Sequence, residues 1–193
     1  MTQRADGVFV HPDGRCESDD VGAGTRIWAF AHVLPGAVIG VDCNVCDHAY
    51  VEAGAVVGNG VTIKNGVQIW DGVSLEDHVF VGPNATFTND ILPRAFIKKD
   101  PSQFLPTVVR SGATIGANAT VICGATVGQE SFVAAGAVVV SDVPAHALMA
   151  GNPARRIAWA CTCGRALPES LQCAACGKRF RLVDESAGLA SAD

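Results

Sequence analysis

Residues 33–63, VLPGAVIGVDCNVCDHAYVEAGAVVGNGVTI, carry an aliphatic side chain at every sixth position. The same period runs from Val21 to Phe87 and again from Val109 to Val139, giving eighteen positions, of which sixteen are β-branched. Six residues suit one short strand and one corner, and three such sides close a triangular coil. The repeat therefore predicts an all-β fold, a parallel β-helix of six coils. A β-sandwich is disfavoured, because its strands would recur about every ten residues.

The composition excludes several classes of protein. Among the 193 residues, 49% are hydrophobic and 17% are charged, which is too apolar for a disordered chain. No apolar run is long enough to span a bilayer, and the first residues lack the features of a signal peptide, so we expect a cytoplasmic protein with no membrane partner. The eight cysteines are then expected to be thiols or metal ligands rather than disulfides.

The charges are distributed unevenly along the chain. The net charge of −5 argues against nucleic acid as a partner. Residues 1–90 nevertheless sum to −8, whereas residues 94–181 sum to +6. We therefore expect a phosphate-bearing ligand in the basic half.

The breaks in the period divide the chain into segments. The β-helix is expected over residues 21–144, after an N-terminal segment of residues 1–20. Phe87 and Val109 are 22 residues apart where one step takes six, so residues 88–108 should leave the coils as a loop. Residues 145–160 should close the helix. A cysteine-rich knuckle over residues 161–183 and a disordered tail over residues 184–193 complete the chain.

Residues eighteen apart stack above one another in such a fold, so the sequence places side chains in columns. One corner column consists of Phe30, His48, Gly66 and Asn84. On the adjoining face, Tyr50, Gln68 and Trp70 are expected to point outward. This wall has the chemistry of a sugar or nucleotide site, but also that of an interface between subunits, and the two interpretations are compatible.

The repeats resemble the hexapeptide-repeat acyltransferases over approximately residues 20–156. This resemblance implies that the coils are left-handed and that a short C-terminal helix follows them. It also implies a homotrimer, with acyl-CoA bound in the groove between neighbouring prisms. The active site would then need two chains.

Three segments carry a closer resemblance: IWAFAHV (27–33), VQIWDGV (67–73) and VGPNATFTND (81–90). They are similar to the nucleotide-sugar 3-N-acetyltransferases, above all to those acetylating UDP-2-acetamido-3-amino-2,3-dideoxy-glucuronate for surface polysaccharides such as the lipopolysaccharide O-antigen. A neighbouring subgroup acts on dTDP-linked 3-amino-3,6-dideoxyhexoses, which is the alternative acceptor. The resemblance implies acetyl-CoA as the co-substrate and places Asn84 at the reacting centre. A non-catalytic β-helix scaffold is the remaining alternative.

The expected reaction needs an unprotonated amine, a held thioester and a donor for the oxyanion. A sugar amine with a pKa of about 8 is partly neutral at physiological pH, so no strong base is required. In the expected mechanism, Asn84 orients the amine and a backbone N–H of the next coil stabilises the oxyanion. His48 is the one candidate for a side-chain base, although a lone corner histidine is more often structural.

Further residues are candidates for binding the two substrates. Arg94, in the expected loop, suits the acceptor's diphosphate or carboxylate. Near the end of the coils, Asn152, Arg155 and Arg156 are candidates for binding CoA, because paired arginines match phosphate geometry. Two related activities are disfavoured. The start of the loop lacks the histidine of O-acetyltransferases, and the five histidines lack the close pair of the γ-type carbonic anhydrases.

The C-terminal part carries a metal motif. Cys161 and Cys163 form one tight pair and Cys173 and Cys176 a second, separated by nine residues, with a glycine after each pair. Four thiols at this spacing predict a tetrahedral zinc knuckle. Four thiolate ligands leave no open position, so the predicted Zn²⁺ is structural. The alternative is four free thiols on a flexible tail.

Overall fold

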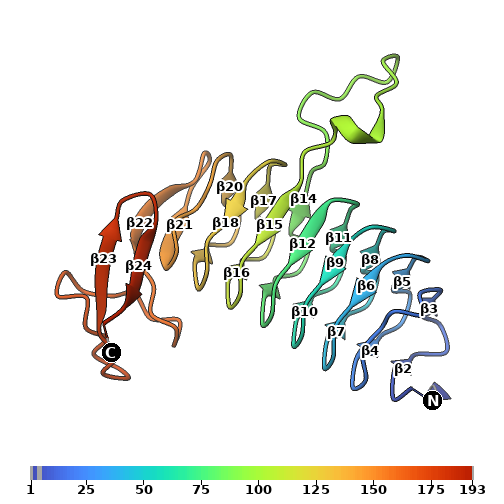
Figure 1. Cartoon of the computed structure of the whole chain (residues 1–193), viewed down its shortest axis with the longest axis horizontal. Coiled ribbons are helices and arrows are strands. Elements are labelled where there is room, and N and C mark those ends of the chain that lie inside the picture. Colours follow the sequence, from blue (N-terminus) through green and yellow to red (C-terminus); the bar gives the residue numbers. More distant parts are fainter. Residues whose placement is uncertain (1, 4–5, 193) are drawn as a thin grey trace.

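The repeats form a β-solenoid with one parallel sheet on each of its three sides (Figure 1). The structure is a computed structural model and describes residues 2–3 and 6–192. Within that part of the chain, the longest sheet stacks eight parallel strands, from β2 to β21. No helix among the described residues is long and apolar enough to cross a membrane.

The three sheets have the following strands. Sheet A comprises β1 (Thr2–Gln3), β2 (Phe9–Val10), β4 (Arg26–Ile27), β7 (Asn44–Val45), β10 (Thr62–Ile63), β13 (Phe80–Val81), β16 (Thr114–Ile115), β19 (Phe132–Val133), β21 (Ala147–Ala150) and β22 (Arg155–Trp159). Sheet B comprises β3 (Arg15–Cys16), β5 (His32–Val33), β8 (Tyr50–Val51), β11 (Gln68–Ile69), β14 (Thr86–Phe87), β17 (Thr120–Val121) and β20 (Val138–Val139). Sheet C comprises β6 (Val38–Ile39), β9 (Val56–Val57), β12 (Val73–Leu75), β15 (Thr107–Val109) and β18 (Thr126–Val127).

The register confirms the coil of eighteen residues. Thr62 of β10 pairs with Asn44 of β7 on one side and with Phe80 of β13 on the other, each eighteen residues away. All eighteen inward positions of the sequence period are buried, and their aliphatic side chains form one continuous core. The branched side chains thus fill the prism as predicted.

Glycine is required where consecutive coils come into contact. Gly40 follows the inward residue Ile39, and a Cβ atom at Gly40 would lie 2.7 Å from the backbone of Gly58 in the next coil. Gly22 has the same relation to Gly40, because a Cβ atom at Gly22 would lie 2.6 Å from the backbone of Gly40. A side chain at either position would push two coils apart and break their hydrogen bonds.

The solenoid has more coils than the period predicts. Residues 1–20 were expected to precede the coils, but β2 and β3 pair in parallel with β4 and β5 and so form part of an additional coil. Val10 pairs with Ile27 and Cys16 with Val33, a separation of seventeen residues rather than eighteen. Because this coil is one residue shorter, its inward-facing residues do not fall on the six-residue period counted from Val21. The period therefore could not predict this coil.

The C-terminal part also differs from expectation. The short C-terminal helix expected after the coils is not found among the described residues; β21 and β22 follow the last coil instead and pair antiparallel at the end of sheet A. β22 thereby covers the open strand edge that the last coil would otherwise expose. The expected disordered tail contributes to a hairpin of β23 (Phe180–Asp184) and β24 (Gly188–Ser191). Leu189 of this hairpin is buried, so the hairpin is held against the rest of the chain.

The predicted loop projects from the side of the solenoid (Figure 1). It connects β14 of sheet B to β15 of sheet C and contains the 3₁₀ helix η1 (Pro101–Gln103). The loop ends two residues earlier than expected, because Thr107 and Val108 already belong to β15. The coil on either side is undisturbed, since Leu75 pairs with Val109 across the insertion.

Two adjacent valines on β9 test the arrangement of the core. Val57 faces the interior and is 1% exposed, whereas Val56 faces solvent and is 44% exposed. Val57→Ala is expected to lower the free energy of unfolding by about 2 kcal/mol, because it removes two buried methyl groups and leaves a cavity. Val56→Ala should change it by less than about 0.5 kcal/mol. Urea denaturation followed by circular dichroism measures both, and equal effects would contradict this assignment of the two faces.

Candidate active site

The predicted corner column lies where sheets A and B meet. The backbone N–H of Phe30, His48, Gly66 and Asn84 each donates to a carbonyl of the preceding coil, at 2.9, 3.2, 3.1 and 2.9 Å respectively. All four have left-handed backbone conformations, with φ between 55° and 73°. Asparagine and glycine tolerate this conformation well. The column therefore stacks one residue per coil, at about 4.8 Å per step.

Asn84, the last of these four residues along the column, presents an exposed amide. Its side chain lies over Gly66, where a Cβ atom would clash with the Asn84 Oδ1 atom. Among the described residues, nothing forms a hydrogen bond with the Asn84 side-chain amide. The amide is thus placed by its backbone and is free to bind a ligand.

His48 lies two coils from Asn84 in the same column. Its ring stacks on Phe30 with a centroid separation of 4.9 Å and an interplanar angle of 15°. Two strand spacings amount to about 10 Å, which exceeds the reach of a hydrogen bond. Within one chain, His48 therefore does not contact an amine held at Asn84.

The predicted wall is formed by neighbouring strands of sheet B. Gln68 Nε2 donates to the Gly66 carbonyl at 2.6 Å, and Trp70 Nε1 donates to the Phe87 carbonyl at 2.8 Å. The rings of Tyr50 and Trp70 are 5.8 Å apart. These contacts fix the three predicted side chains beside the corner column.

The additional N-terminal coil extends this wall with an acidic group. Glu17 Oε2 lies 3.2 Å from Nε2 of His32, which is next to Tyr50 on sheet B. The hydrogen bond with His32 and the nearby Arg15 hold the pKa of Glu17 below its usual value. Sequence reasoning missed Glu17 because the coil that carries it is out of frame.

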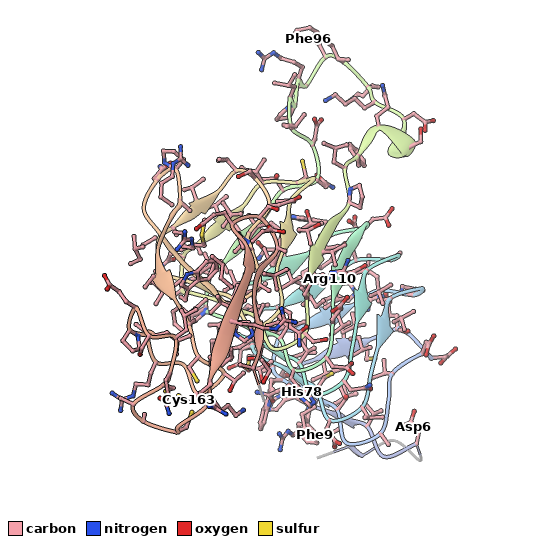
Figure 2. The ribbon with its side chains drawn as sticks, turned by 60° about the vertical axis from the view of Figure 1, so that its left-hand side comes forward. Asp6, Phe9, His78, Phe96, Arg110 and Cys163 are labelled. Carbon is pink, nitrogen blue, oxygen red and sulfur yellow. The ribbon has the colours of Figure 1, made fainter. Side chains whose placement is uncertain are left out.

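Arg94 lies in the loop, away from the column of its own chain. Its Nη1 atom donates to the Pro93 carbonyl at 3.1 Å, and its side chain is exposed. Lys99 braces the loop through an ion pair with Asp90 and a hydrogen bond to the Leu92 carbonyl at 3.0 Å. Phe96 is 82% exposed and lies at the outer end of the loop (Figure 2). The loop thus places Arg94 at a distance from the coils of its own chain, with its side chain exposed to solvent.

The three candidate CoA ligands follow the last coil. Asn152 and Arg155 are exposed, and Arg155 Nη1 donates to the Ala154 carbonyl at 2.9 Å. Arg156 is engaged within the chain, because it forms an ion pair with Glu185 and its guanidinium lies 4.1 Å from the centroid of the Trp159 ring. Arg155 is therefore the more available partner for a phosphate group.

The four cysteines of the predicted knuckle come together. Cys161 and Cys176 have their sulfur atoms 3.5 Å apart, as do Cys163 and Cys173, and all four sulfur atoms lie within 4.8 Å of one another. A tetrahedral zinc–thiolate site has sulfur–sulfur distances of about 3.8 Å, so the cluster fits zinc. Backbone N–H groups of Cys176 and Ala175 lower the pKa of Cys173 to about 6, which favours the thiolate.

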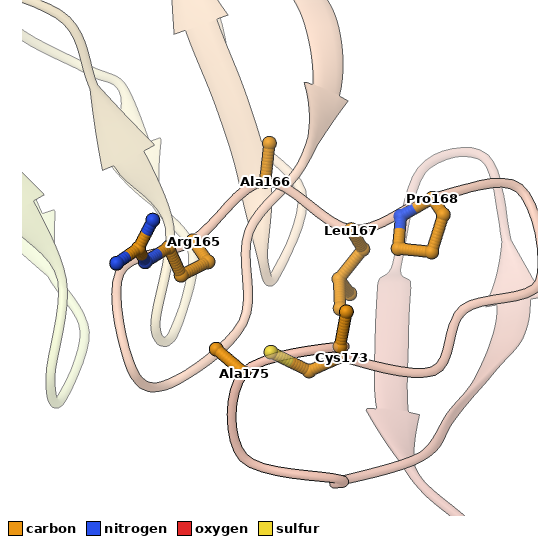
Figure 3. A pocket seen from close by; sticks show the side chains of 7 residues that line it. Arg165, Ala166, Leu167, Pro168, Cys173 and Ala175 are labelled. Atoms are coloured by element: carbon orange, nitrogen blue, oxygen red, sulfur yellow. The ribbon is translucent and has the colours of Figure 1, made fainter.

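A cavity of about 440 Å³ lies beside this cluster, between Cys173 and the segment Arg165–Pro168 (Figure 3). Its lining is mostly apolar, from residues such as Leu167 and Pro168. Arg165 and Cys173 are its only titratable lining groups among the described residues. The cavity belongs to the knuckle and offers none of the groups that acyl transfer requires.

Comparisons with known proteins agree with the repeat. The family model described as bacterial transferase hexapeptide (six repeats) matches residues 54–89, and that described as hexapeptide repeat of succinyl-transferase matches residues 106–141. The dTDP-3-amino-3,6-dideoxy-alpha-D-galactopyranose 3-N-acetyltransferase of Aneurinibacillus thermoaerophilus is 45% identical over 186 residues, which cover 95% of this chain and 96% of that protein.

Solved structures share the fold. The acetyltransferase domain of PglB from Neisseria gonorrhoeae, in complex with acetyl coenzyme A, superposes with a TM-score of 0.59 at 27% identity. The match covers 79% of this chain and 58% of that structure, so the present chain spans less than two thirds of its length. A second structure of the same domain gives a TM-score of 0.57. With the repeat, the fold and a relative of nearly the same length in agreement, the chain belongs to the hexapeptide-repeat family of N-acetyltransferases.

Proposed function

We propose that this enzyme transfers the acetyl group of acetyl-CoA to the 3-amino group of a dTDP-linked 3-amino-3,6-dideoxyhexose. The observation that carries the proposal is the 45% identity, over 95% of the chain, to an enzyme named for that reaction. The sequence alone favoured the UDP-linked uronate and kept the dTDP-linked sugar as the alternative. The relative favours the alternative, and the acyl-transfer chemistry is the same for both. The alternative of a non-catalytic β-helix scaffold is disfavoured, because the relative is named as an N-acetyltransferase.

The mechanism is direct attack of the neutral amine on the thioester carbonyl. Asn84 accepts a hydrogen bond from the amine through its side-chain oxygen and so aims the nitrogen lone pair at the carbonyl carbon. The C–N bond forms first and gives a tetrahedral oxyanion. As the oxyanion collapses, the C–S bond breaks, and the departing CoA thiolate takes the proton of the former amine directly or through water. His48 is not needed as a base, because a sugar amine with a pKa of about 8 is partly neutral at physiological pH.

A backbone group of the next coil can stabilise the oxyanion. In that coil, Asn118 continues the corner column, and its N–H is already bound to the Pro83 carbonyl at 3.0 Å. The N–H of the preceding residue, Ala117, forms no hydrogen bond within the described residues. Ala117 is therefore the proposed donor, since a fixed backbone N–H at a developing negative charge costs no reorganisation.

We propose that the enzyme is a homotrimer whose loop contacts a neighbouring subunit. Four large apolar side chains of the loop are more than half exposed in the single chain: Ile91, Leu92, Phe96 and Ile97. Such a concentration on a projecting segment is typical of an interaction surface. In the trimer, Arg94 would reach the acceptor of the adjoining subunit, and Tyr50, Gln68 and Trp70 would form the wall of the site.

The co-substrate would lie along the later coils. Asn152 and Arg155 supply polar groups for its phosphates, whereas Arg156 holds β22 in place through Glu185 and Trp159. The knuckle packs against this same strand, because Leu167 N–H donates to the Trp159 carbonyl at 2.8 Å. We propose that the knuckle binds one structural Zn²⁺, supported by the mutual distances of Cys161, Cys163, Cys173 and Cys176.

The choice of acceptor is tested by turnover. The protein is incubated with acetyl-CoA and, separately, with dTDP-3-amino-3,6-dideoxygalactose and UDP-2-acetamido-3-amino-2,3-dideoxy-glucuronate. Mass spectrometry detects the added acetyl group and avoids thiol dyes, which would react with the eight cysteines. We expect the dTDP-linked sugar to be acetylated. Turnover of the UDP-linked sugar alone would overturn the proposed acceptor.

The role of Asn84 is tested with a glycine variant, since glycine accepts a φ of 55° without strain. Asn84→Gly is expected to lower kcat about 100-fold, because the amine is no longer oriented. The matched control is His78→Gly, a residue with a φ of 60° at a different corner of the coil. Steady-state kinetics compare the two variants. Equal kcat values would show that Asn84 has no part in the reaction.

The knuckle is tested through its metal content and its stability. We expect one zinc per chain by elemental analysis, and loss of zinc in Cys176→Ser. The matched control is Cys123→Ser, a buried solenoid cysteine that should leave the zinc bound. Among the described residues, the buried cluster around the knuckle contains five side chains, one of them Leu189 of the following hairpin, so removing the metal should unfold the knuckle and leave the solenoid folded. Zinc-free wild-type protein with an unchanged melting curve would refute this site.

A further inference from the structure

An aromatic shelf lies at the N-terminal end of the edge between sheets A and B. It consists of Phe9 and Trp28, whose ring centroids are 5.4 Å apart, and Figure 2 labels Phe9. The two rings line a cavity of about 440 Å³ together with His11, Pro12 and Arg26. Trp28 is 37% exposed, although tryptophan is highly buried on average in folded proteins. The shelf therefore offers an open aromatic surface to a ligand.

The Trp28 ring is held in place before any ligand arrives. Its Nε1 atom donates to Asn44 Oδ1 at 2.7 Å, and Asn44 Nδ2 in turn approaches Cys46 Sγ at 3.2 Å. A preformed platform loses little conformational entropy on binding. None of these contacts belongs to the acyl-transfer site or to the knuckle.

Two cations lie along the same edge, Arg26 at the shelf itself and Lys64 beyond it. Cys46 is one coil beyond Trp28 and Lys64 is two coils beyond it, in the column next to the corner column. Burial raises the pKa of the Cys46 thiol; Lys64 and Arg26 are close enough to oppose this rise, whereas the neighbouring Asp47 adds to it. Residues 1–90 have a net charge of −8, so two basic side chains along one edge are a notable concentration.

The order of these groups along the edge matches the order of groups in a nucleotide sugar. The aromatic shelf comes first, with Arg26 beside it; Lys64 lies two coils beyond Trp28, and the amide of Asn84 comes last. Trp28 and Asn84 are three coils apart, about 14 Å at the spacing of stacked strands. This span is comparable to an extended nucleoside diphosphate sugar, measured from its base to carbon 3 of the hexose.

We propose that the pyrimidine base of the acceptor stacks on the shelf of Phe9 and Trp28 and that its diphosphate lies between Arg26 and Lys64. This inference rests on the proposed function, because it extends the acceptor from the amine at Asn84 back to its nucleotide. His48, in the adjoining corner column, then faces the diphosphate rather than the reacting amine. Base stacking on aromatic side chains and cationic contacts with phosphate are the usual means of recognising such ligands.

The test measures nucleotide binding without any sugar. Isothermal titration calorimetry of dTDP, UDP and thymidine is carried out on the wild-type protein, Trp28→Leu and Lys64→Gln. The matched control is Phe132→Leu, an aromatic residue in the outward column of sheet A that begins with Phe9, but beyond the coil of Asn84. Trp28→Leu is expected to weaken dTDP binding about tenfold, and Phe132→Leu to leave it unchanged. Lys64→Gln should weaken dTDP and spare thymidine, because only dTDP carries phosphates.

Each result decides for or against the shelf. The proposal is wrong if the wild-type protein binds neither dTDP nor UDP at millimolar concentration, or if Trp28→Leu weakens binding no more than Phe132→Leu. It is also wrong if Trp28→Leu dissociates the assembly with unchanged nucleotide affinity, since the shelf would then be an interface between subunits. Should Trp28→Leu fail to fold, the contrast between dTDP and thymidine in Lys64→Gln decides.

The outcomes for the shelf and for the reaction are separable. Trp28-dependent binding of dTDP without turnover of the dTDP-linked sugar would support the shelf and reject the proposed acceptor. Turnover of that sugar with the same acceptor KM in wild type and Trp28→Leu would support the acceptor and reject the shelf.

Discussion

The hydrogen bonding between successive coils is the constraint on which the whole molecule depends. Each coil must lie one strand spacing from the next along all three sides, or the short strands lose their partners. This spacing excludes a side chain at Gly22 and Gly40 and imposes left-handed conformations at the corners. The strands of the solenoid are mostly only two residues long, so no strand could persist without the neighbours above and below it.

The same stacking organises the chemistry. Because every coil contributes one residue to each column, a column becomes a series of functional groups at fixed intervals. The corner column places Asn84 and His48 about 10 Å apart, so the orienting role proposed for Asn84 is separate from any role of His48 farther along the ligand. Rigid backbone can also supply hydrogen-bond donors, such as the Ala117 N–H proposed for the oxyanion. The proposed mechanism therefore needs few specialised side chains and no catalytic triad.

Much of this arrangement could be predicted from the sequence, because an eighteen-residue coil converts sequence separation into position. The stacking of Phe30 on His48 and of Asn84 over Gly66, and the wall of Tyr50, Gln68 and Trp70, follow from that single number. The coil of β2 and β3 was missed because its separation is seventeen residues, which hides Phe9 and Glu17 from the period. The short helix that the resemblance implied after the coils is replaced by strand β22, because nothing local to Arg155–Trp159 shows that an open sheet edge is available for pairing. The engagement of Arg156 depends on Glu185, a contact between distant residues that no motif encodes.

The loop of residues 88–106 shows how such a protein can change without losing its fold. Its residues leave at one corner, and the chain re-enters the prism in register, with Leu75 still paired to Val109. An insertion at a corner thus leaves the pairing of the coils unchanged. A single extra residue inside a strand, in contrast, would shift the register of every strand after it. Corners are therefore the places where evolution, or an engineer, can lengthen the polypeptide and acquire new specificity while the architecture is inherited intact.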